Sequence, residues 1–294
     1  MELIFSQVLN TIVLRPYVFI FLLVYLLGCS LHLGVKRAVL FCIAGYLIAW
    51  LSEYSSIHNG IPYGHYYYIE HTKGRELWVL GVPFMDSLSY VFLAYASYCM
   101  ALLVSSPVLL SKGVVYLVET KKARSSLYTT VLGAVFLVYL DIIIDPVALQ
   151  GDRWFLGQIY GYPEKGAYFG IPISNFAGWL AVGFLLIYVL QKIDSLLQRG
   201  SDWSGHRYPW RYLIGPGLYA GVLLFNLSIT FYIGEYNLGW SGIFIVLLPS
   251  LLFFTIKLRP SRTTFEQALK AHLSDFPQAV VPGAAVQSRR PLQE

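Results

Sequence analysis

The sequence has few charged residues. Asp, Glu, Lys and Arg make up 13% of the 294 residues and hydrophobic residues 56%, whereas a typical soluble domain carries roughly 25% charged residues. No basic stripe with interleaved aromatic residues is present, which argues against nucleic acid as a partner. The composition therefore predicts an all-α, polytopic integral membrane protein whose apolar residues face lipid or neighbouring helices.

Cysteines and cofactor motifs are also scarce. Cys29, Cys42 and Cys99 lie in apolar segments without metal-ligand spacing, so we interpret them as small packing residues. A nucleophile elbow, a phosphate-binding loop, a dinucleotide fingerprint and an HExxH motif are all missing from the sequence. The sequence thus predicts neither a metal nor an organic cofactor.

Seven apolar segments have the roughly 17–25 residues that a membrane crossing needs. They cover about 17–33, 38–55, 84–105, 126–146, 173–191, 212–233 and 239–256. Pro16, Pro83 and Pro172 stand at or just before segment starts, where proline suits a helix. We expect a transmembrane domain over 1–256. A cytoplasmic tail over 257–294 should hold a short amphipathic helix near 263–274 and otherwise be largely disordered.

Positive charge is unevenly divided between the two sets of connections. Of the 21 Lys and Arg residues, 16 lie in one set together with the tail, and 5 lie in the other. Because Lys and Arg are retained on the cytoplasmic side, this predicts a prokaryotic inner-membrane protein with its N-terminus outside and its C-terminus in the cytoplasm.

Four carboxylates lie within about one turn of the end of an apolar segment: Glu53, Asp86, Asp141 and Asp145. A carboxylate at mid-bilayer costs roughly 2.5–3.5 kcal/mol on insertion scales, and such residues usually mark functional sites. The predicted topology puts all four in the outer half of the membrane. We therefore expect them to form one polar site.

An internal repeat adds a fifth residue to this site. The hexapeptide 81–86, GVPFMD, matches 170–175, GIPISN, at an offset of 89 residues. This predicts two parallel helix–loop–helix units, about 38–105 and 126–191, in which Asn175 occupies the position of Asp86. Parallel repeats often build a binding site between them.

Each polar residue also has a purely structural interpretation. Asp86 and Asn175 can cap helix N-termini, Asp145 can simply end its helix before Pro146, and Glu53 can be a surface residue. Asp141 and Asp145 are four residues apart, so they share a helix face and can share a proton. Such a DxxxD pair also binds magnesium diphosphate in membrane prenyltransferases, but this sequence lacks their second Asp-rich motif.

The two predicted outer loops, 57–82 and 147–171, are rich in aromatic residues and glycine. Aromatic belts at membrane interfaces explain much of this enrichment. Alternatively, the loops form a lid over a long apolar ligand. The candidate ligand-binding residues are Tyr63, His65, Tyr68, Trp154, Tyr168 and, in the fifth segment, Trp179.

Taken together, these motifs resemble a known family. The first group of matching residues is Glu53, Pro62-Tyr63-Gly64, Tyr68, Gly81-Val82-Pro83 and Asp86. The second is Asp141, Asp145-Pro146, Tyr168-Phe169-Gly170-Ile171-Pro172 and Asn175-Phe176-Ala177-Gly178-Trp179. Over roughly 17–256 the chain looks like the integral-membrane carotenoid 1′,2′-hydratases of the CruF type, which act on γ-carotene or bisanhydrobacterioruberin.

The resemblance implies addition of water to the terminal C1=C2 bond of a ψ end group. Such a reaction needs a proton donor, for which Glu53 or the Asp141/Asp145 pair is the candidate, and groups that position water, for which Asp86 and Asn175 are the candidates. The implied partners are a long apolar carotenoid, water, membrane lipid and other carotenoid-forming enzymes. Two alternatives stay open: a carotenoid cyclase using the same protonation, and a proton-coupled transporter or lipid-binding protein.

Overall fold

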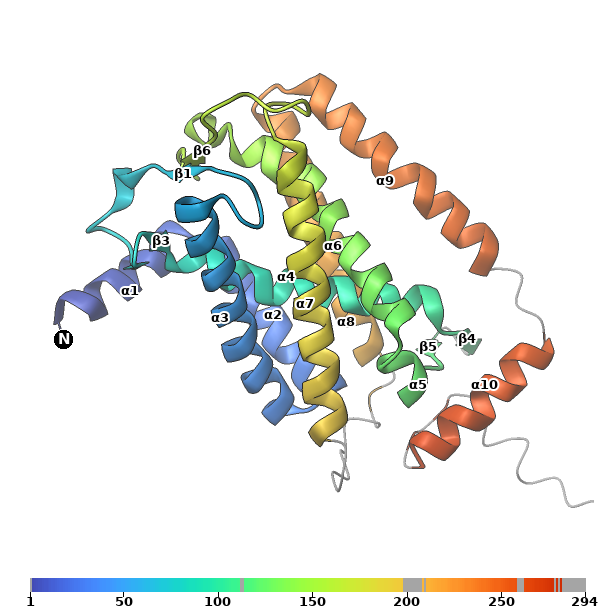
Figure 1. Ribbon diagram of the computed structural model, residues 1–294. Coiled ribbons are helices and arrows are strands. Elements are labelled where there is room, and N and C mark those ends of the chain that lie inside the picture. The colour runs from blue at the N-terminus through green and yellow to red at the C-terminus, as the bar shows by residue number, and fades with distance from the viewer. Residues whose placement is uncertain are drawn as a thin grey trace, which may run out of the picture.

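The computed structural model describes residues 2–111, 114–197, 208, 210–257, 262–277, 279 and 281. Nearly all of its regular structure is helical (Figure 1): α1 (Glu2–Leu14), α2 (Pro16–His32), α3 (Val35–Asn59), α4 (Phe84–Ser105), α5 (Lys121–Arg124), α6 (Leu127–Ala148), α7 (Ile173–Leu197), α8 (Arg211–Tyr232), α9 (Tyr236–Lys257) and α10 (Arg262–Asp275). The short strands are β1 (Tyr67–Tyr68), β2 (Trp78–Val79), β3 (Val82–Pro83), β4 (Val108–Ser111), β5 (Val114–Leu117) and β6 (Tyr160–Gly161). They pair antiparallel as β1–β6, β2–β3 and β4–β5.

Five helices are long and apolar enough to cross a membrane: α3, α4, α6, α7 and α8. A sixth candidate is the pair α1–α2, which bends by 90° between Leu14 and Pro16. The seventh predicted span falls on α9, of which Tyr236–Leu247 is an apolar helix too short to qualify by itself. The structure thus confirms an all-helical protein with several candidate spans, whereas the count of seven stays a prediction.

Helix α4 lies at the centre of the bundle, where Figure 1 shows it crossing behind α7. It contacts α2, α3, α6, α7 and α8, and 78% of its apolar window is buried inside the protein. Small residues allow neighbouring backbones to approach closely. At Gly215 of α8, for example, an added Cβ would lie 2.3 Å from the sulfur of Cys99.

The turns that precede α4 and α7 have the same backbone conformation. Leu80 and Gly81 have positive φ angles of 49° and 86°, and Phe169 and Gly170 have φ angles of 48° and 90°. In the first turn Val79 pairs with Val82, and in the second Tyr168 pairs with Ile171. Each equivalent position is 89 residues further along the chain, as the sequence match predicts. Two turns that share a backbone conformation deliver their helices in the same way.

The predicted amphipathic helix of the tail is present as α10 (Arg262–Asp275) and packs against the membrane domain. His272 is fully buried, and the backbone N–H of Lys121 donates to Asp275 Oδ2 at 2.8 Å. This part of the tail is therefore docked. The expected disorder over the other tail residues falls mostly on 258–261 and 282–294, which lie outside the described residues.

Candidate functional site

The Asp141, Asp145 and Asn175 side chains form one half of the site. Asn175, in the first turn of α7, donates from Nδ2 to Asp141 Oδ2 at 2.9 Å and to Asp145 Oδ2 at 2.7 Å. Asp141 is fully buried, and Asn175 and Asp145 are 4% and 7% exposed. Since the amide bonds to both carboxylates, Asn175 does more than cap its helix.

Glu53 and Asp86 form the other half. Glu53, near the end of α3, is 2% exposed and accepts a hydrogen bond from the Ser87 hydroxyl. Asp86 accepts a hydrogen bond from the Tyr68 hydroxyl at 2.6 Å. Burial rules out the interpretation of Glu53 as a surface residue.

The loops 57–82 and 147–171 pair with each other beside the site. Strands β1 and β6 place Tyr67 opposite Gly161 and Tyr68 opposite Tyr160. The two halves then line a single polar cavity of about 40 Å³, room for roughly three water molecules. Its walls are Glu53, Tyr63, Tyr66, Tyr68, Asp86, Tyr90, Asp145, Tyr160, Tyr162, Asn175 and Trp179.

The loop tyrosines that line this cavity donate hydrogen bonds through neutral hydroxyls. Burial raises the pKa of Tyr68 well above its usual range, and the nearby Asp86 and Glu53 raise it further. Burial likewise raises the pKa values of Tyr66, Tyr160 and Tyr162. These phenols stay neutral near pH 7, so each keeps a hydrogen to donate to a carboxylate or to water.

An apolar cavity of about 100 Å³ adjoins the polar one. Both cavities are lined by Asp86, Asp145, Tyr160 and Trp179, which form the wall between them. The remaining walls of the apolar cavity are mostly hydrophobic, with aromatic rings from Tyr17, Phe21, Phe92, Trp154 and Phe225. A hydrocarbon in one cavity would thus face carboxylates that also face the other.

Comparison with known proteins identifies the family. A family model described as carotenoid biosynthesis protein matches residues 8–249, most of the chain. The chain belongs to the carotenoid biosynthesis protein family. No curated protein and no solved structure matches it.

The matched family region contains every residue that the sequence analysis put in the site. Of the predicted ligand-binding residues, Tyr63, Tyr68 and Trp179 line the polar cavity, and Trp154 lines the apolar one. His65 is exposed, and Tyr168 packs edge-on against Phe176. Neither His65 nor Tyr168 is among the residues that line the two cavities.

Several cavity residues of this carotenoid biosynthesis protein were not predicted. Tyr90 lies one helical turn after Asp86, and this spacing was an available signal. Tyr66, Tyr160 and Tyr162 reach the site only because β1 pairs with β6, and no local pattern in the sequence announces that pairing. Ser87 offers no signal beyond its place beside Asp86.

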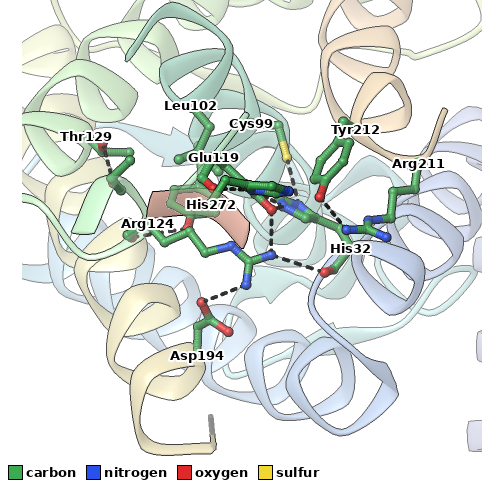
Figure 2. Close-up of polar contacts among 12 residues, drawn as sticks. His32, Cys99, Leu102, Glu119, Arg124, Thr129, Asp194, Arg211, Tyr212 and His272 are labelled. Atoms are coloured by element: carbon green, nitrogen blue, oxygen red, sulfur yellow. Dashed lines mark hydrogen bonds and ion pairs between the residues drawn. The ribbon is translucent and has the colours of Figure 1, made fainter. Parts of the chain in front are cut away.

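A second buried polar cluster, the Glu119 cluster, shares no residue with the linings of the two cavities, and Figure 2 shows its contacts. Glu119 accepts hydrogen bonds from His32 Nε2 at 2.9 Å and from Arg124 Nη2 at 2.9 Å. Arg124 also approaches Asp194 at 3.6 Å, and Asp194 pairs with Arg37 at 3.0 Å. Burial alone would raise the pKa of Glu119, but Arg124 and His32 hold it well below its usual range. The cluster ties together α2, α3, α5 and α7.

In the part of the chain that the structure describes, no three His, Cys, Asp or Glu residues are grouped so as to hold a metal ion. The described site offers carboxylic acids, phenols, an amide and aromatic rings for chemistry. The carboxylates can exchange protons with a bound molecule, and the polar cavity is large enough for water.

Proposed function

We propose that this member of the carotenoid biosynthesis family hydrates the terminal C1=C2 bond of a carotenoid ψ end group. The observation that carries the proposal is the wall between the cavities, where Asp86 and Asp145 face both. An end group in the apolar cavity would have an acid on one side and water just beyond it. A carotenoid with a ψ end group, such as γ-carotene, is the proposed substrate, and its product is a tertiary 1-hydroxy carotenoid.

The reaction begins with a proton transfer from a carboxylic acid on the wall of the apolar cavity to the alkene. In this proposal Asp145 gives its proton to C2, and the positive charge develops at C1. Asn175 holds Asp141 and Asp145 together, so a proton can be shared between the two carboxyls. Asp141 Oδ1 is buried without a hydrogen-bond partner among the described residues. A buried oxygen in that condition is costly as a bare anion and less so when it carries the proton.

Water then attacks C1 and loses a proton to a carboxylate. Asp86 fits this role because it lines both cavities. The Tyr68 hydroxyl donates a hydrogen bond to Asp86, as it would to an unprotonated carboxylate that can accept a proton. Glu53 lines only the polar cavity and not the apolar one. It is therefore better placed to exchange protons with water than to contact the substrate. The proton taken up by Asp86 then returns to Asp145 through water in the polar cavity. The cycle therefore consumes only water as a co-substrate.

Aromatic rings would stabilise the cation. Trp179 lies on the shared wall and stacks on Tyr90 with ring centroids 4.3 Å apart and planes 5° apart. Each ring face directed at a cation contributes about 0.5–2 kcal/mol. A rigid stacked pair holds that face in place throughout the reaction.

The proposal extends to the membrane arrangement. Two parallel repeat units would form the site between them, each supplying a carboxylate at a helix end and a polar residue at the next helix start. With seven spans and the N-terminus outside, the site would lie in the outer half of a prokaryotic inner membrane. An apolar substrate would reach it from the bilayer, where other carotenoid-forming enzymes release their products.

The observations favour hydration over the alternatives. A cyclase would use the same protonation but must keep water from C1, whereas here a polar cavity adjoins the apolar one. A proton-coupled transporter needs polar groups along the whole path. The described polar groups of this site gather at one end of α3, α4, α6 and α7, and the Glu119 cluster, at the other ends of α3 and α7, lines neither cavity.

The test is Asp145→Asn in cells that make γ-carotene, with pigments resolved by chromatography and mass. The unmodified protein should give a product heavier by one water molecule, and the variant should lower its rate of formation by about 10²–10⁴-fold, as loss of a general acid does. Asp152→Asn, in the exposed part of the same outer region, is the matched control. A product of unchanged mass would indicate cyclisation, and full hydration by Asp145→Asn would refute the assigned acid.

A further inference from the structure

The apolar cavity is bordered by an aromatic door, defined here as Tyr17 of α2, Phe225 of α8, and Trp154 and Phe155 of the second outer loop. Tyr17 and Phe225 stack with ring centroids 5.2 Å apart and planes 19° apart. Tyr17 also packs edge-on against Phe155 at 5.7 Å, and Trp154 lies 6.3 Å from Phe225. Three of the four, Tyr17, Trp154 and Phe225, line the cavity.

The outer side of the door faces the surroundings of the bundle. Phe155 is 57% exposed, and Tyr17 and Phe225 are half-buried. Their helical neighbours Ile20 and Leu224 are 58% and 65% exposed. Large apolar residues that stay exposed on membrane-spanning helices face lipid. The door therefore separates the apolar cavity from lipid, with aromatic rings as the separating layer.

A buried ion pair holds the frame of this door. Arg15, at the bend between α1 and α2, donates from Nε and Nη2 to the two carboxylate oxygens of Glu76, each at 3.0 Å. The same guanidinium donates from Nη1 to the backbone oxygen of Leu156. One side chain thus links α2 with both outer loops. Such bidentate pairing fixes orientation as well as distance.

The location of this ion pair connects it to the cavity. Tyr17 is two residues after Arg15, and Leu156, whose backbone Arg15 binds, lines the cavity itself. Arg15 and Glu76 are 2% and 0% exposed. Removing one partner of a buried ion pair leaves the charge of the other without compensation, which is strongly destabilising. Arg15 and Glu76 are therefore expected to stay paired.

We propose that the hydrocarbon enters the apolar cavity sideways from the bilayer, between α2 and α8, through the Tyr17–Phe225 door, and that the Arg15–Glu76 pair sets how far this door opens. The inference rests on the proposed function for the identity of the hydrocarbon, a long linear polyene. Because the polyene enters from the bilayer, the polar cavity needs an opening only wide enough for water. Arg15 and Glu76 act as positioning residues, since neither lines the cavity.

The first experiment measures the door by its effect on rates. The full-length protein is reconstituted in phosphatidylcholine–phosphatidylglycerol vesicles containing lycopene, and uptake and release are followed by quenching of tryptophan fluorescence. Phe225→Leu removes the stacked ring while keeping an apolar side chain. We expect uptake and release to accelerate by the same factor, fivefold or more, with equilibrium occupancy changed less than twofold. A door changes both directions equally, whereas a residue that only lines the cavity changes occupancy.

Phe184→Leu is the matched control, because Phe184 is a partly exposed ring on α7 that stacks on Tyr188 instead. It should leave both rates unchanged. Equal rates for Phe225→Leu, Phe184→Leu and the unmodified protein would overturn the door. So would a change confined to occupancy.

The second experiment tests the ion pair by exchange of charges. Arg15→Glu and Glu76→Arg each break the link, and the double variant restores a pair with reversed polarity. We expect faster uptake and release in each single variant and recovery to within threefold of the unmodified rates in the double variant. Arg15→Lys, which keeps the charge but not the bidentate geometry, covers the case in which a charge reversal fails to fold. Rates unchanged in Arg15→Lys, or unrescued rates in a folded double variant, would refute the positioning role.

These measurements separate the inference from the proposed function. Uptake that depends on Phe225 without formation of a hydrated product would keep the door and reject hydration. Hydrated product together with uptake indifferent to Phe225 and Arg15 would keep hydration and reject the door. Absence of lycopene uptake by the unmodified protein would reject the door directly.

Discussion

At the scale of single residues, the Asn175 amide holds the arrangement on which the site depends. It bonds to Asp141 and Asp145 at once, so it fixes the positions of two carboxylates that would otherwise repel one another. An amide suits this place because it donates and remains neutral. A carboxylate at the same position, as the repeat partner Asp86 has, would add a further negative charge beside a buried acidic pair.

Replacing Asn175 by Leu should therefore impair both activity and stability. The side chain keeps its size but loses both hydrogen bonds, and each buried oxygen left unpaired costs about 1–3 kcal/mol. We expect hydration to fall by at least tenfold and the midpoint of thermal unfolding to drop. Product analysis in cells and a melting curve in detergent measure the two effects, with the exposed Asn237→Leu as control. Full activity in Asn175→Leu would contradict the role given to the amide.

The hydroxyl of Tyr68 provides a second prediction at this scale. Tyr68→Phe removes the donor that Asp86 accepts at 2.6 Å while keeping the ring. Loss of a hydrogen bond to a charged group costs about 1.5–3 kcal/mol, so the rate of hydration should fall by roughly one to two powers of ten. The neighbouring Tyr67→Phe, at a ring that is 51% exposed, should have no effect. Equal rates for the two variants would show that Asp86 does not depend on this donor.

Sequence reasoning found the polar half of the site and missed much of its aromatic half, for a physical reason. The cost of burying Glu53, Asp86 and Asp141 in an apolar segment is a local property, visible in any window of the sequence. The contribution of Tyr160 depends on a pairing between two strands of two residues each, about ninety residues apart. Pairing of that kind is decided by the packed helices beneath it.

At the scale of elements, α10 packs against the rest of the bundle through a buried histidine whose two ring nitrogens both have hydrogen-bond partners. His272 Nδ1 donates to the backbone oxygen of Glu119 at 2.6 Å, and Nε2 lies 2.9 Å from the Tyr116 hydroxyl. A neutral ring donates with the first nitrogen and accepts with the second. Protonation would turn the acceptor into a donor and place a charge near Arg124 and Arg211. The other groups around the ring are Glu119, Tyr116, His32, Tyr212 and Asp275.

Docking of α10 should therefore weaken in acid. Burial lowers the pKa of His272 from its usual value of 6.5 despite its bond to Glu119, so the undocked helix binds the proton more readily than the docked one. Docking should be fully stable above about pH 6.5 and lose at most about 1.4 kcal/mol per unit below it. The rate of trypsin cleavage after the exposed Lys270 reports the fraction of molecules in which α10 is undocked. It is measured in buffers between pH 5 and pH 8.

Two comparisons make this pH prediction decisive. His272→Gln cannot titrate, so its cleavage should show no step below pH 6.5 beyond the pH dependence of trypsin on an unstructured peptide. His71→Gln, at an exposed histidine of the first outer loop, should retain the step. A step that survives His272→Gln would assign the titration to another group of the Glu119 cluster.

The sequence predicted the α10 helix and its amphipathic character but not its docking. Periodicity defines which face is apolar, yet the partner of that face is formed by Tyr116 and Glu119, about 150 residues earlier. The two turns before α4 and α7 show the opposite case. There the glycine and proline positions already specify a backbone with positive φ followed by a helix start, so local sequence sufficed.

At the scale of the whole molecule, the uneven distribution of Lys and Arg determines how the bundle should lie in the membrane. The prediction is tested with single cysteines at Lys165 and Lys122, both exposed, after Cys29, Cys42 and Cys99 are replaced by Ala. A membrane-impermeant maleimide should label Lys165→Cys in intact cells and Lys122→Cys only after lysis. The reverse pattern would invert the proposed topology and move the site to the cytoplasmic half.

The burial of α4 also constrains how this protein is made. A ribosome releases α4 into the bilayer before α6, α7 and α8 exist, although 78% of its apolar window ends up inside the bundle. Glu53 and Tyr68, the partners of Ser87 and Asp86, are already present at that stage, but the apolar face of α4 and Ser97 still lack the later helices that cover them. The nascent chain must therefore keep α4 at the insertion machinery until α8 has been translated, some hundred residues later. We therefore expect the bundle to be completed only after α8 has been inserted, and truncations that end before α8 to be degraded.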